Sequence, residues 1–132
     1  MTRRLLSVNV GRPAEVPWRG ETVRTAIVKS PVARRLAVRR LNVDGDEQAD
    51  LEAHGGEHRA VFVYDEASIR HWAAALGRDD LAPGRFGENF TVQGMEDGAV
   101  CIGDVFRIGS ALLEVSQPRV TCFKVGMALG EP

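Results

Sequence analysis

The residue best suited to chemistry in this sequence is a cysteine, Cys122, in the stretch SQPRVTCFKVG. Arg119 and Lys124 flank it, and Pro118 interrupts the strand-like segment just before it. Nearby cations stabilise a thiolate, which is the form that acts as a nucleophile and as a ligand for soft metals. Packing as a small apolar residue is the ordinary alternative, and the local sequence leaves both interpretations open. The other cysteine, Cys101, lies between apolar residues in AVCIGD, so we expect it to pack in the core.

A second candidate is a glycine-containing loop between two histidines, His54 and His58. The spacing is that of a zinc-binding HExxH helix, but Gly55 and Gly56 lie between the histidines and break that motif. Paired glycines instead let a backbone approach a ligand closely and offer N–H groups to an anion. With His54 before the glycines and Arg59 after them, the loop is a candidate phosphate or carboxylate site. A tight turn with a solvated histidine is the alternative.

The stretch APGRFGENFTV is a third candidate, because Arg85, Glu88 and Asn89 gather at the start of a short strand. Gly84 and Gly87 permit unusual backbone angles there. The amide of an asparagine carries a donor and an acceptor, so Asn89 could read the edge of a heterocycle. A surface loop in which the asparagine caps the strand is an equal alternative.

A fourth candidate is the pair Lys29 and Ser30 in VKSPV, which could bind an anion at the end of a strand. An ordinary turn is the alternative for this pair.

Composition and missing motifs exclude several classes of function. The chain has 132 residues, a net charge of -1 and only eight aromatic residues (two Trp, one Tyr and five Phe), so neither nucleic acid nor a membrane is an expected partner. There is no Walker loop, GxGxxG, GxSxG or metal-spaced Cys/His set. No apolar run is long enough for a membrane helix or a signal peptide, and two cysteines are too few for a disulfide framework. We therefore expect one cytoplasmic domain.

The elements that must position these residues are mostly strands. Short segments rich in β-branched residues predict strands at 5–10, 22–28, 36–43, 60–64 and 89–92. Residues 104–117 predict a hairpin that turns at Gly109–Ser110. Asp65 and Gly77 bound a predicted helix at about 66–76, where apolar residues recur at helical spacing. Because closure removes exposed strand edges, we expect a mainly β fold, with a closed or nearly closed barrel and at least one helix.

Four of these segments, in their order along the chain, resemble a known family. The stretches GDEQADLEAHGGEHRAVFVY, GRFGENFTV and CIGDVFRIGSALLEVSQPR, and the Cys of VTCFK, are similar to the motifs of the MOSC domain, named after the C-terminal part of molybdenum cofactor sulfurase. The resemblance runs from about Lys29 to the C-terminus and is greatest to small bacterial stand-alone proteins that detoxify N-hydroxylated purines. It implies a single MOSC domain over residues 1–132 with a β-barrel of MOSC type.

Two departures from the family pattern are visible. Relatives usually carry Pro directly before the Cys, where this chain has Thr121. They also continue with further helices and at least one strand, whereas this chain ends ten residues after Cys122. We therefore expect a domain truncated at its C-terminus, in which homodimerisation would cover the open barrel edge.

The resemblance implies that the domain binds molybdenum cofactor, whose pyranopterin holds the metal through dithiolene sulfurs. Cys122 would be the metal ligand and the catalytic residue, Arg119 would supply charge near the metal, and Arg85 and Asn89 would hold the pterin. Residues from two segments would receive the cofactor phosphate: Lys29, Ser30, His54, Gly55, Gly56 and Arg59. The family is also associated with pyridoxal phosphate binding.

The implied activity is reduction of N-hydroxylated compounds, such as hydroxylaminopurines or amidoximes, to amines or amidines. Two electrons and two protons convert N–OH to N–H with release of water. Two cysteines cannot hold a four-Cys iron–sulfur cluster and no flavin or NAD motif is present, so a separate flavin or iron–sulfur reductase is the expected electron donor. Glu88, Asp46 and His54 are candidates for proton delivery.

Two other functions remain open from the sequence. A carrier that delivers sulfur or the cofactor to another enzyme would hold a persulfide on Cys122 and would need no stable metal site. A structural barrel without a cofactor is a third reading.

Overall fold

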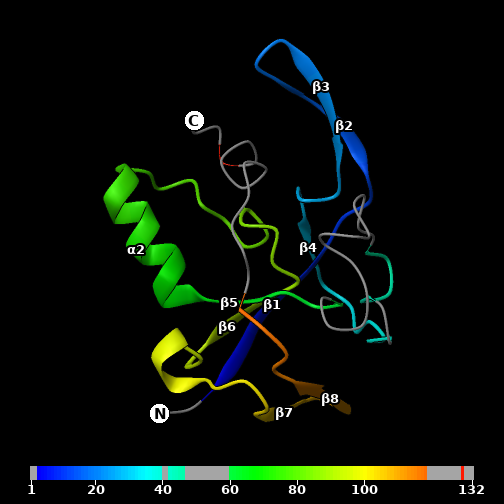
Figure 1. The fold of residues 1–132 in the computed structure, drawn as a ribbon, viewed down its shortest axis with the longest axis vertical. Coiled ribbons are helices and arrows are strands. Elements are labelled where there is room, and N and C mark those ends of the chain that lie inside the picture. The colour runs from blue at the N-terminus through cyan, green and yellow to red at the C-terminus, as the bar shows by residue number, and fades with distance from the viewer. Residues whose placement is uncertain (1–2, 40–41, 47–59, 119–128, 130–132) are drawn as a thin grey trace.

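The computed structural model describes residues 3–39, 42–46, 60–118 and 129, and the structural statements below concern these residues (Figure 1). Their main sheet has the strand order β4-β1-β6-β5 and consists of β1 (Arg4–Val10), β4 (Ser30–Val32), β5 (Val63–Asp65) and β6 (Phe90–Gln93). Strand β1 is antiparallel to β4 and β6, whereas β5 runs parallel to β6. The central pair, β1 and β6, therefore joins the beginning of the chain to residues far along it.

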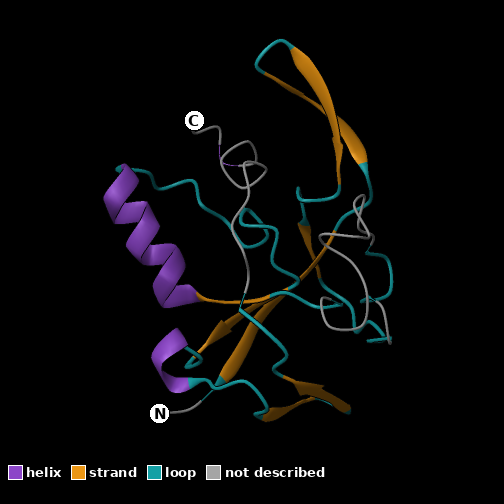
Figure 2. Cartoon of the chain, viewed as in Figure 1, coloured by secondary structure: helices purple, strands orange, loops and turns teal. Residues whose placement is uncertain are grey.

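Two further sheets are hairpins, and neither pairs with another described strand. One consists of β2 (Ala14–Trp18) and β3 (Glu21–Thr25), and the other of β7 (Val105–Ile108) and β8 (Ala111–Glu114). Figure 2 shows the β2–β3 hairpin extending away from the main sheet and the β7–β8 hairpin at the opposite end of the view. The described strands thus form three open sheets, and the predicted closed barrel is not formed among them.

Helix α2 (Glu66–Leu76) follows β5 directly and confirms the predicted helix. Its N-cap is Asp65, whose Oδ1 accepts a hydrogen bond of 2.8 Å from the amide of Ala67. Gly77 ends the helix in the left-handed conformation, with φ of 63°, which a residue without a Cβ adopts at little cost. A short 3-10 helix, η2 (Asp97–Ala99), follows β6. No helix in the described ranges is both long and apolar enough to cross a membrane.

The described apolar residues form two clusters. One lies on the main sheet around Val43, Phe90 and Val92. The other lies beside helix α2, where Ile69, Phe86 and Leu129 pack together. The second cluster brings the helix, the connection between α2 and β6, and Leu129 into one core.

The predicted strand at 36–43 is wrong. Val38 and Val43 form a single isolated bridge, and the amide of Asp44 donates to the carbonyl of Ala37 in a turn. The predicted strand at 22–28 ends at Thr25, because the hydroxyl of Thr25 accepts a hydrogen bond of 3.1 Å from the amide of Ile27 and bends the chain.

Strands β2 and β4 lie outside the predicted strands, and each contains a proline. Among the described strands, Pro17 lies in β2, which pairs with β3 on one side only, and Pro31 lies in β4, at the edge of the main sheet. Edge strands accept proline because they do not need every N–H for pairing. The other predicted strands and the β7–β8 hairpin are confirmed, with β5 starting at Val63 and not at residue 60.

Candidate functional site

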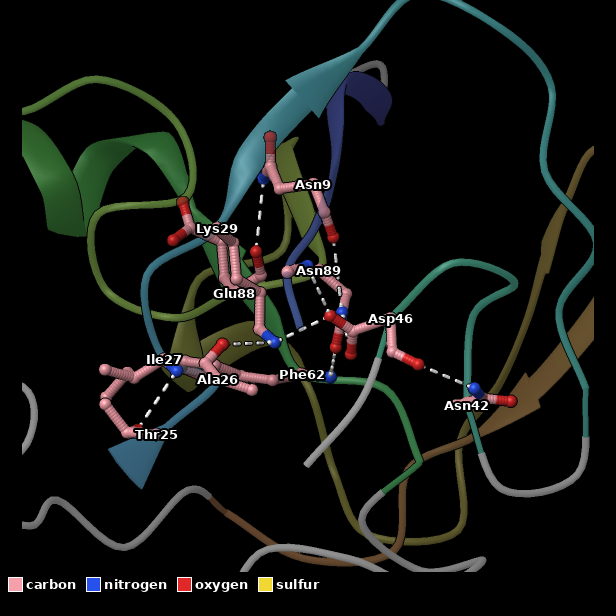
Figure 3. Close-up of polar contacts among 11 residues, drawn as sticks. Asn9, Thr25, Ala26, Ile27, Lys29, Asn42, Asp46, Phe62, Glu88 and Asn89 are labelled. Atoms are coloured by element: carbon pink, nitrogen blue, oxygen red, sulfur yellow. Dashed lines mark hydrogen bonds and ion pairs between the residues drawn. The ribbon is translucent and has the colours of Figure 1, made fainter. Parts of the chain in front are cut away.

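A group of buried polar side chains lies where the main sheet meets the loop that precedes β6 (Figure 3). We call it the buried polar cluster: Asn9, Lys29, Asp46, Glu88, Asn89 and Thr91. A buried polar group is costly unless it is hydrogen-bonded, and a buried charge is costlier still unless it is paired. The hydrogen bonds of these side chains therefore determine whether each one supports the fold or could bind a ligand.

Asp46 is the centre of the buried polar cluster and is only 1% exposed. Its Oδ1 accepts from Nζ of Lys29 at 2.7 Å and from the amide of Gly11 at 2.8 Å, and its Oδ2 accepts from Nδ2 of Asn89 at 2.9 Å. Nζ of Lys29 also donates to the carbonyl of Ala26 at 3.0 Å. Lys29 and Asp46 therefore form a buried ion pair. The implied role of Lys29 in holding a phosphate stays a prediction, as does that of Ser30, which is exposed at the start of β4.

Asn89 joins three segments of the chain. Its Oδ1 accepts from the amide of Phe62 at 3.0 Å, and its Nδ2 donates to Asp46 and, at 3.3 Å, to the carbonyl of Asn9. The oxygen and both N–H donors of the side-chain amide are thus hydrogen-bonded within the protein. Reading the edge of a pterin, as the sequence suggested, would require the exchange of one of these hydrogen bonds.

Glu88 is fully buried and is hydrogen-bonded within its own loop. Its Oε1 accepts from the amide of Phe86 at 3.1 Å, and its Oε2 accepts from the hydroxyl of Thr91 at 2.9 Å. The hydroxyl of Thr91 accepts in turn from Nδ2 of Asn9 at 3.1 Å. Burial raises the pKa of the Glu88 carboxyl, and hydrogen bonds from the loop amides and Thr91 offset part of that rise.

Two glycines let the loop before β6 lie directly on the segment that carries Lys29. Gly84 and Gly87 have φ of 93° and 82°. A Cβ on Gly84 would come within 2.5 Å of the carbonyl oxygen of Lys29, and a Cβ on Gly87 within 2.7 Å of Cγ1 of Ile27. Both positions therefore require glycine for conformation and for space.

Arg85 lies on this same loop and has an unusual environment. Its Nε is buried and has no hydrogen-bond partner, while its side chain as a whole is 36% exposed. Within the described part of the chain, the nearest acidic atom is Oδ2 of Asp80, 3.8 Å from Nη2. Arg78 already holds Asp80 with two hydrogen bonds, Nε to Oδ1 at 2.7 Å and Nη2 to Oδ2 at 2.6 Å. Arg85 consequently keeps N–H donors that an anionic or carbonyl group of a ligand could satisfy.

The hydrogen bonds of Arg78 also explain the acidity of Asp80. They lower the pKa of the Asp80 carboxyl from 3.8 to about 2, and the charge of Arg85 adds a smaller effect in the same direction. Asp80 is thus ionised at any pH at which the protein would work.

Of the predicted site residues, the structure brings Lys29 and Asn89 together around Asp46 and places Arg85 on the adjoining loop. Ser30 lies in β4, and the others lie outside the described residues: His54, Gly55, Gly56, Arg59, Arg119 and Cys122. Within the described part of the chain, no three His, Cys, Asp or Glu side chains are grouped as a metal site would require.

Cys101 corrects one expectation, because it is exposed and not packed in the core. It begins a turn in which its amide donates to Oδ2 of Asp104 at 2.9 Å and its carbonyl accepts from the amide of Asp104 at 3.0 Å. Apolar neighbours in the sequence therefore did not indicate burial.

Sequence reasoning missed Asn9 and considered Asp46 only as a proton donor. The available signal for Asn9 was its place in LLSVNV, where an inward-facing polar residue interrupts an apolar strand.

Comparison with known proteins shows the family to which the chain belongs. The MOSC domain model matches residues 50–132, so the chain belongs to the MOSC domain family. It is 42% identical over 126 residues to the uncharacterized protein YflK of Bacillus subtilis, covering 96% of this chain and 57% of YflK. It is 39% identical over 124 residues to a protein of Gibberella moniliformis named a reductase, covering 92% of this chain and 22% of that protein.

Among solved structures, the chain is similar to YiiM from Geobacillus stearothermophilus, with a TM-score of 0.75 and 32% identity. That match covers 98% of this chain and 57% of YiiM. The chain thus spans a little over half the length of YflK and of this YiiM.

Proposed function

We propose that this chain is a molybdenum-cofactor-binding reductase of N-hydroxylated compounds that works with a separate electron-donor protein. The observation that carries the proposal is the MOSC match over residues 50–132, which includes Cys122 and the loop with Arg85 and Asn89. The similar protein that is named a reductase supports the reaction class.

The described residues fit such a cofactor in one specific respect. Nε of Arg85 is a buried donor without a partner, and a guanidinium binds phosphate and other oxygen acceptors with strong, charge-assisted hydrogen bonds. Meanwhile, the buried polar cluster and two glycines hold the loop of Arg85 in one conformation. In our proposal Arg85 contacts the cofactor, and Asn89 keeps that loop in place.

When bound, the cofactor would supply the two-electron chemistry that removes oxygen from an N–OH group. The part of the chain's own residues is to hold and orient it. In this proposal the Cys122 thiolate is the metal ligand and Arg119 stabilises that charge, because thiolates are favoured beside cations. Lys29, Ser30 and the His54–Arg59 loop remain the proposed phosphate contacts.

The proposal changes the role of two residues that the sequence offered as proton donors. Asp46 and Glu88 are fully buried, and their oxygens accept hydrogen bonds from neighbouring side chains and amides. We therefore assign both to the support of the site. His54 keeps its proposed role in proton delivery.

The first test is elemental analysis for molybdenum on protein purified from a host that makes the cofactor. Wild type and Cys101→Ser should carry about one molybdenum per chain, and Cys122→Ser should carry almost none. Cys101 is the matched control because it is the exposed thiol of the described residues. Loaded protein, supplied with a flavin or iron–sulfur reductase, should then convert a hydroxylaminopurine to the amine.

Absence of molybdenum from correctly folded wild type would contradict the reductase proposal. Persulfide labelling lost on Cys122→Ser, in protein that never held metal, would then support the carrier alternative.

A further inference from the structure

Arg78 has two roles at the end of helix α2. Its amide donates to the carbonyl of Ala73 at 2.9 Å as part of the helix cap. Its side chain is only 19% exposed and donates two hydrogen bonds, from Nε and Nη2, to the carboxylate of Asp80. This fork fixes the direction of the guanidinium, because bidentate Arg–carboxylate pairs are geometrically specific.

The same guanidinium reaches across the chain to residue 129. Its Nη1 donates a hydrogen bond to the backbone carbonyl of Leu129. The side chain of Leu129 is buried and packs with Ile69 and Phe86, which belong to α2 and to the loop of Arg85. Leu129 is therefore held at two points, through its backbone by Arg78 and through its side chain by an apolar cluster.

The carboxylate of Asp80 connects this attachment to the candidate site. Its Oδ2 lies 2.6 Å from Nη2 of Arg78 and 3.8 Å from Nη2 of Arg85. The position of Arg78 thus influences both the attachment of Leu129 and the placement of Arg85.

We propose that Arg78 is a positioning residue, which anchors Leu129 to the connection between α2 and β6 and thereby holds it beside the loop of Arg85. Leu129 lies seven residues after Cys122 in the sequence. The effect on the cofactor rests on the proposed function, but the anchor itself does not.

The direct test is amide hydrogen exchange, followed by mass spectrometry, in the C-terminal peptide 127–132. Arg78→Ala should speed exchange in this peptide by about tenfold or more, since local opening controls exchange. Arg78→Lys, which keeps the charge but loses the fork, should show a smaller increase. Arg70→Ala is the matched control, because Arg70 is an exposed arginine of the nearby helix α2 whose ion-pair partner is Glu66.

A peptide from the β7–β8 hairpin reports whether the variants remain folded. Exchange in the C-terminal peptide that is the same in Arg78→Ala and wild type would overturn the anchor. If Arg78→Ala also exchanges fast in the hairpin, the variant is unfolded. Two other variants are then compared with wild type: Arg78→Lys, and Leu129→Ala, which removes the apolar contacts of the anchor. Unchanged C-terminal exchange in those two variants would overturn it equally.

Molybdenum content separates the two proposals. If wild type holds about one molybdenum per chain, Arg78→Ala should hold less than about a tenth of that at an unchanged hairpin exchange rate. If it retains the full amount, Arg78 is an anchor without a positioning role. If wild type holds none, the proposed function fails while the exchange result still decides the anchor.

Discussion

Two groups of paired charges differ in how deeply they are buried. This difference distinguishes side chains that support the fold from side chains that can bind a ligand. In the buried polar cluster, the side chains of Lys29 and Asp46 are 7% and 1% exposed, and Asp46 accepts three hydrogen bonds from the protein. In the second group, Asp80 and Arg85 are partly exposed, and Nε of Arg85 has no partner. The first group can hold the fold together but offers little to a ligand, whereas the second retains donors for one.

The largest expected effect is the loss of Asp46. Asp46→Ala would remove the carboxylate that pairs with the buried Lys29 ammonium, and breaking a buried ion pair in this way costs about 3–5 kcal/mol. Asp44→Ala is the control, because Asp44 pairs with Arg39 at the exposed surface, and such pairs contribute about 0–1 kcal/mol. Urea unfolding of both variants measures the difference. Equal losses would show that burial does not distinguish the two pairs.

An intermediate effect is expected at Gly84, where the loop of Arg85 meets the Lys29 segment. Gly84→Ala adds both backbone strain at positive φ and a contact of 2.5 Å to a carbonyl oxygen, and we expect a loss of about 2–4 kcal/mol. Gly103→Ala has the same φ of 93° but no atom within 4 Å, so it should lose only about 1–2 kcal/mol. If the two variants unfold at the same urea concentration, the close packing of the two segments is not a source of stability.

A smaller effect should appear as a pH dependence from Glu88. Because burial raises the pKa of its carboxyl, the native state binds the proton more tightly than the unfolded state. The stability contributed by Glu88 is therefore full below its ordinary pKa of 4.5 and is lost as the pH rises through the higher native value. Glu88→Gln cannot ionise, so the stability of wild type relative to this variant should fall between pH 4 and pH 8.

The measurement is the urea midpoint of both proteins at each pH. A relative stability that rises with pH over this interval would mean that the native protein prefers the carboxylate.

The smallest effect on stability is expected in the Arg78–Asp80–Arg85 group, where exposure weakens the ion pairs. Asp80 should titrate at about 2 by carboxyl-carbon NMR, and Arg78→Ala should return the pKa of Asp80 towards 3.8. Because the native pKa is lowered, the contribution of Asp80 is present above 3.8 and is lost as the pH falls towards 2. The same change should lower the urea midpoint slightly at pH 7, and this difference from wild type should disappear as the pH falls from 3.8 towards 2. A difference in midpoint that stays constant over that pH range would contradict the link between Arg78 and Asp80.

The parts of the fold that were predictable have local causes. Helix α2 carries its own signals in Asp65 and Gly77, and the β7–β8 hairpin carries its turn at Gly109–Ser110. The error at residues 22–28 arose because a hydroxyl, that of Thr25, competes with strand pairing for the amide of Ile27. Strand propensity alone does not take that competing hydrogen bond into account.

At the candidate site, the sequence drew attention to some of the described residues but not to the partners that they contact. The sequence singled out Lys29, Arg85 and Asn89, yet the roles of the first and last depend on Asp46, which lies 17 residues from one and 43 from the other. Arg85 has a different role because no acidic group of the described residues lies nearer than 3.8 Å. Spacing along the chain cannot reveal such contacts, since they depend on how separate segments fold together.

The pairing of β1 with β6 has a consequence for the order in which the protein folds. Asn9 and Thr91, which are hydrogen-bonded in the central pair of strands, are 82 positions apart. At a synthesis rate of about 5–20 residues per second, the edge of β1 that pairs with β6 waits roughly 4–16 s on the ribosome before that strand is made, whereas β4, which pairs with the other edge, is made much earlier. The β2–β3 hairpin pairs residues that are close in sequence and can form at once. The newborn chain therefore carries one unpaired edge of its first strand for seconds, and such an edge can pair with another chain.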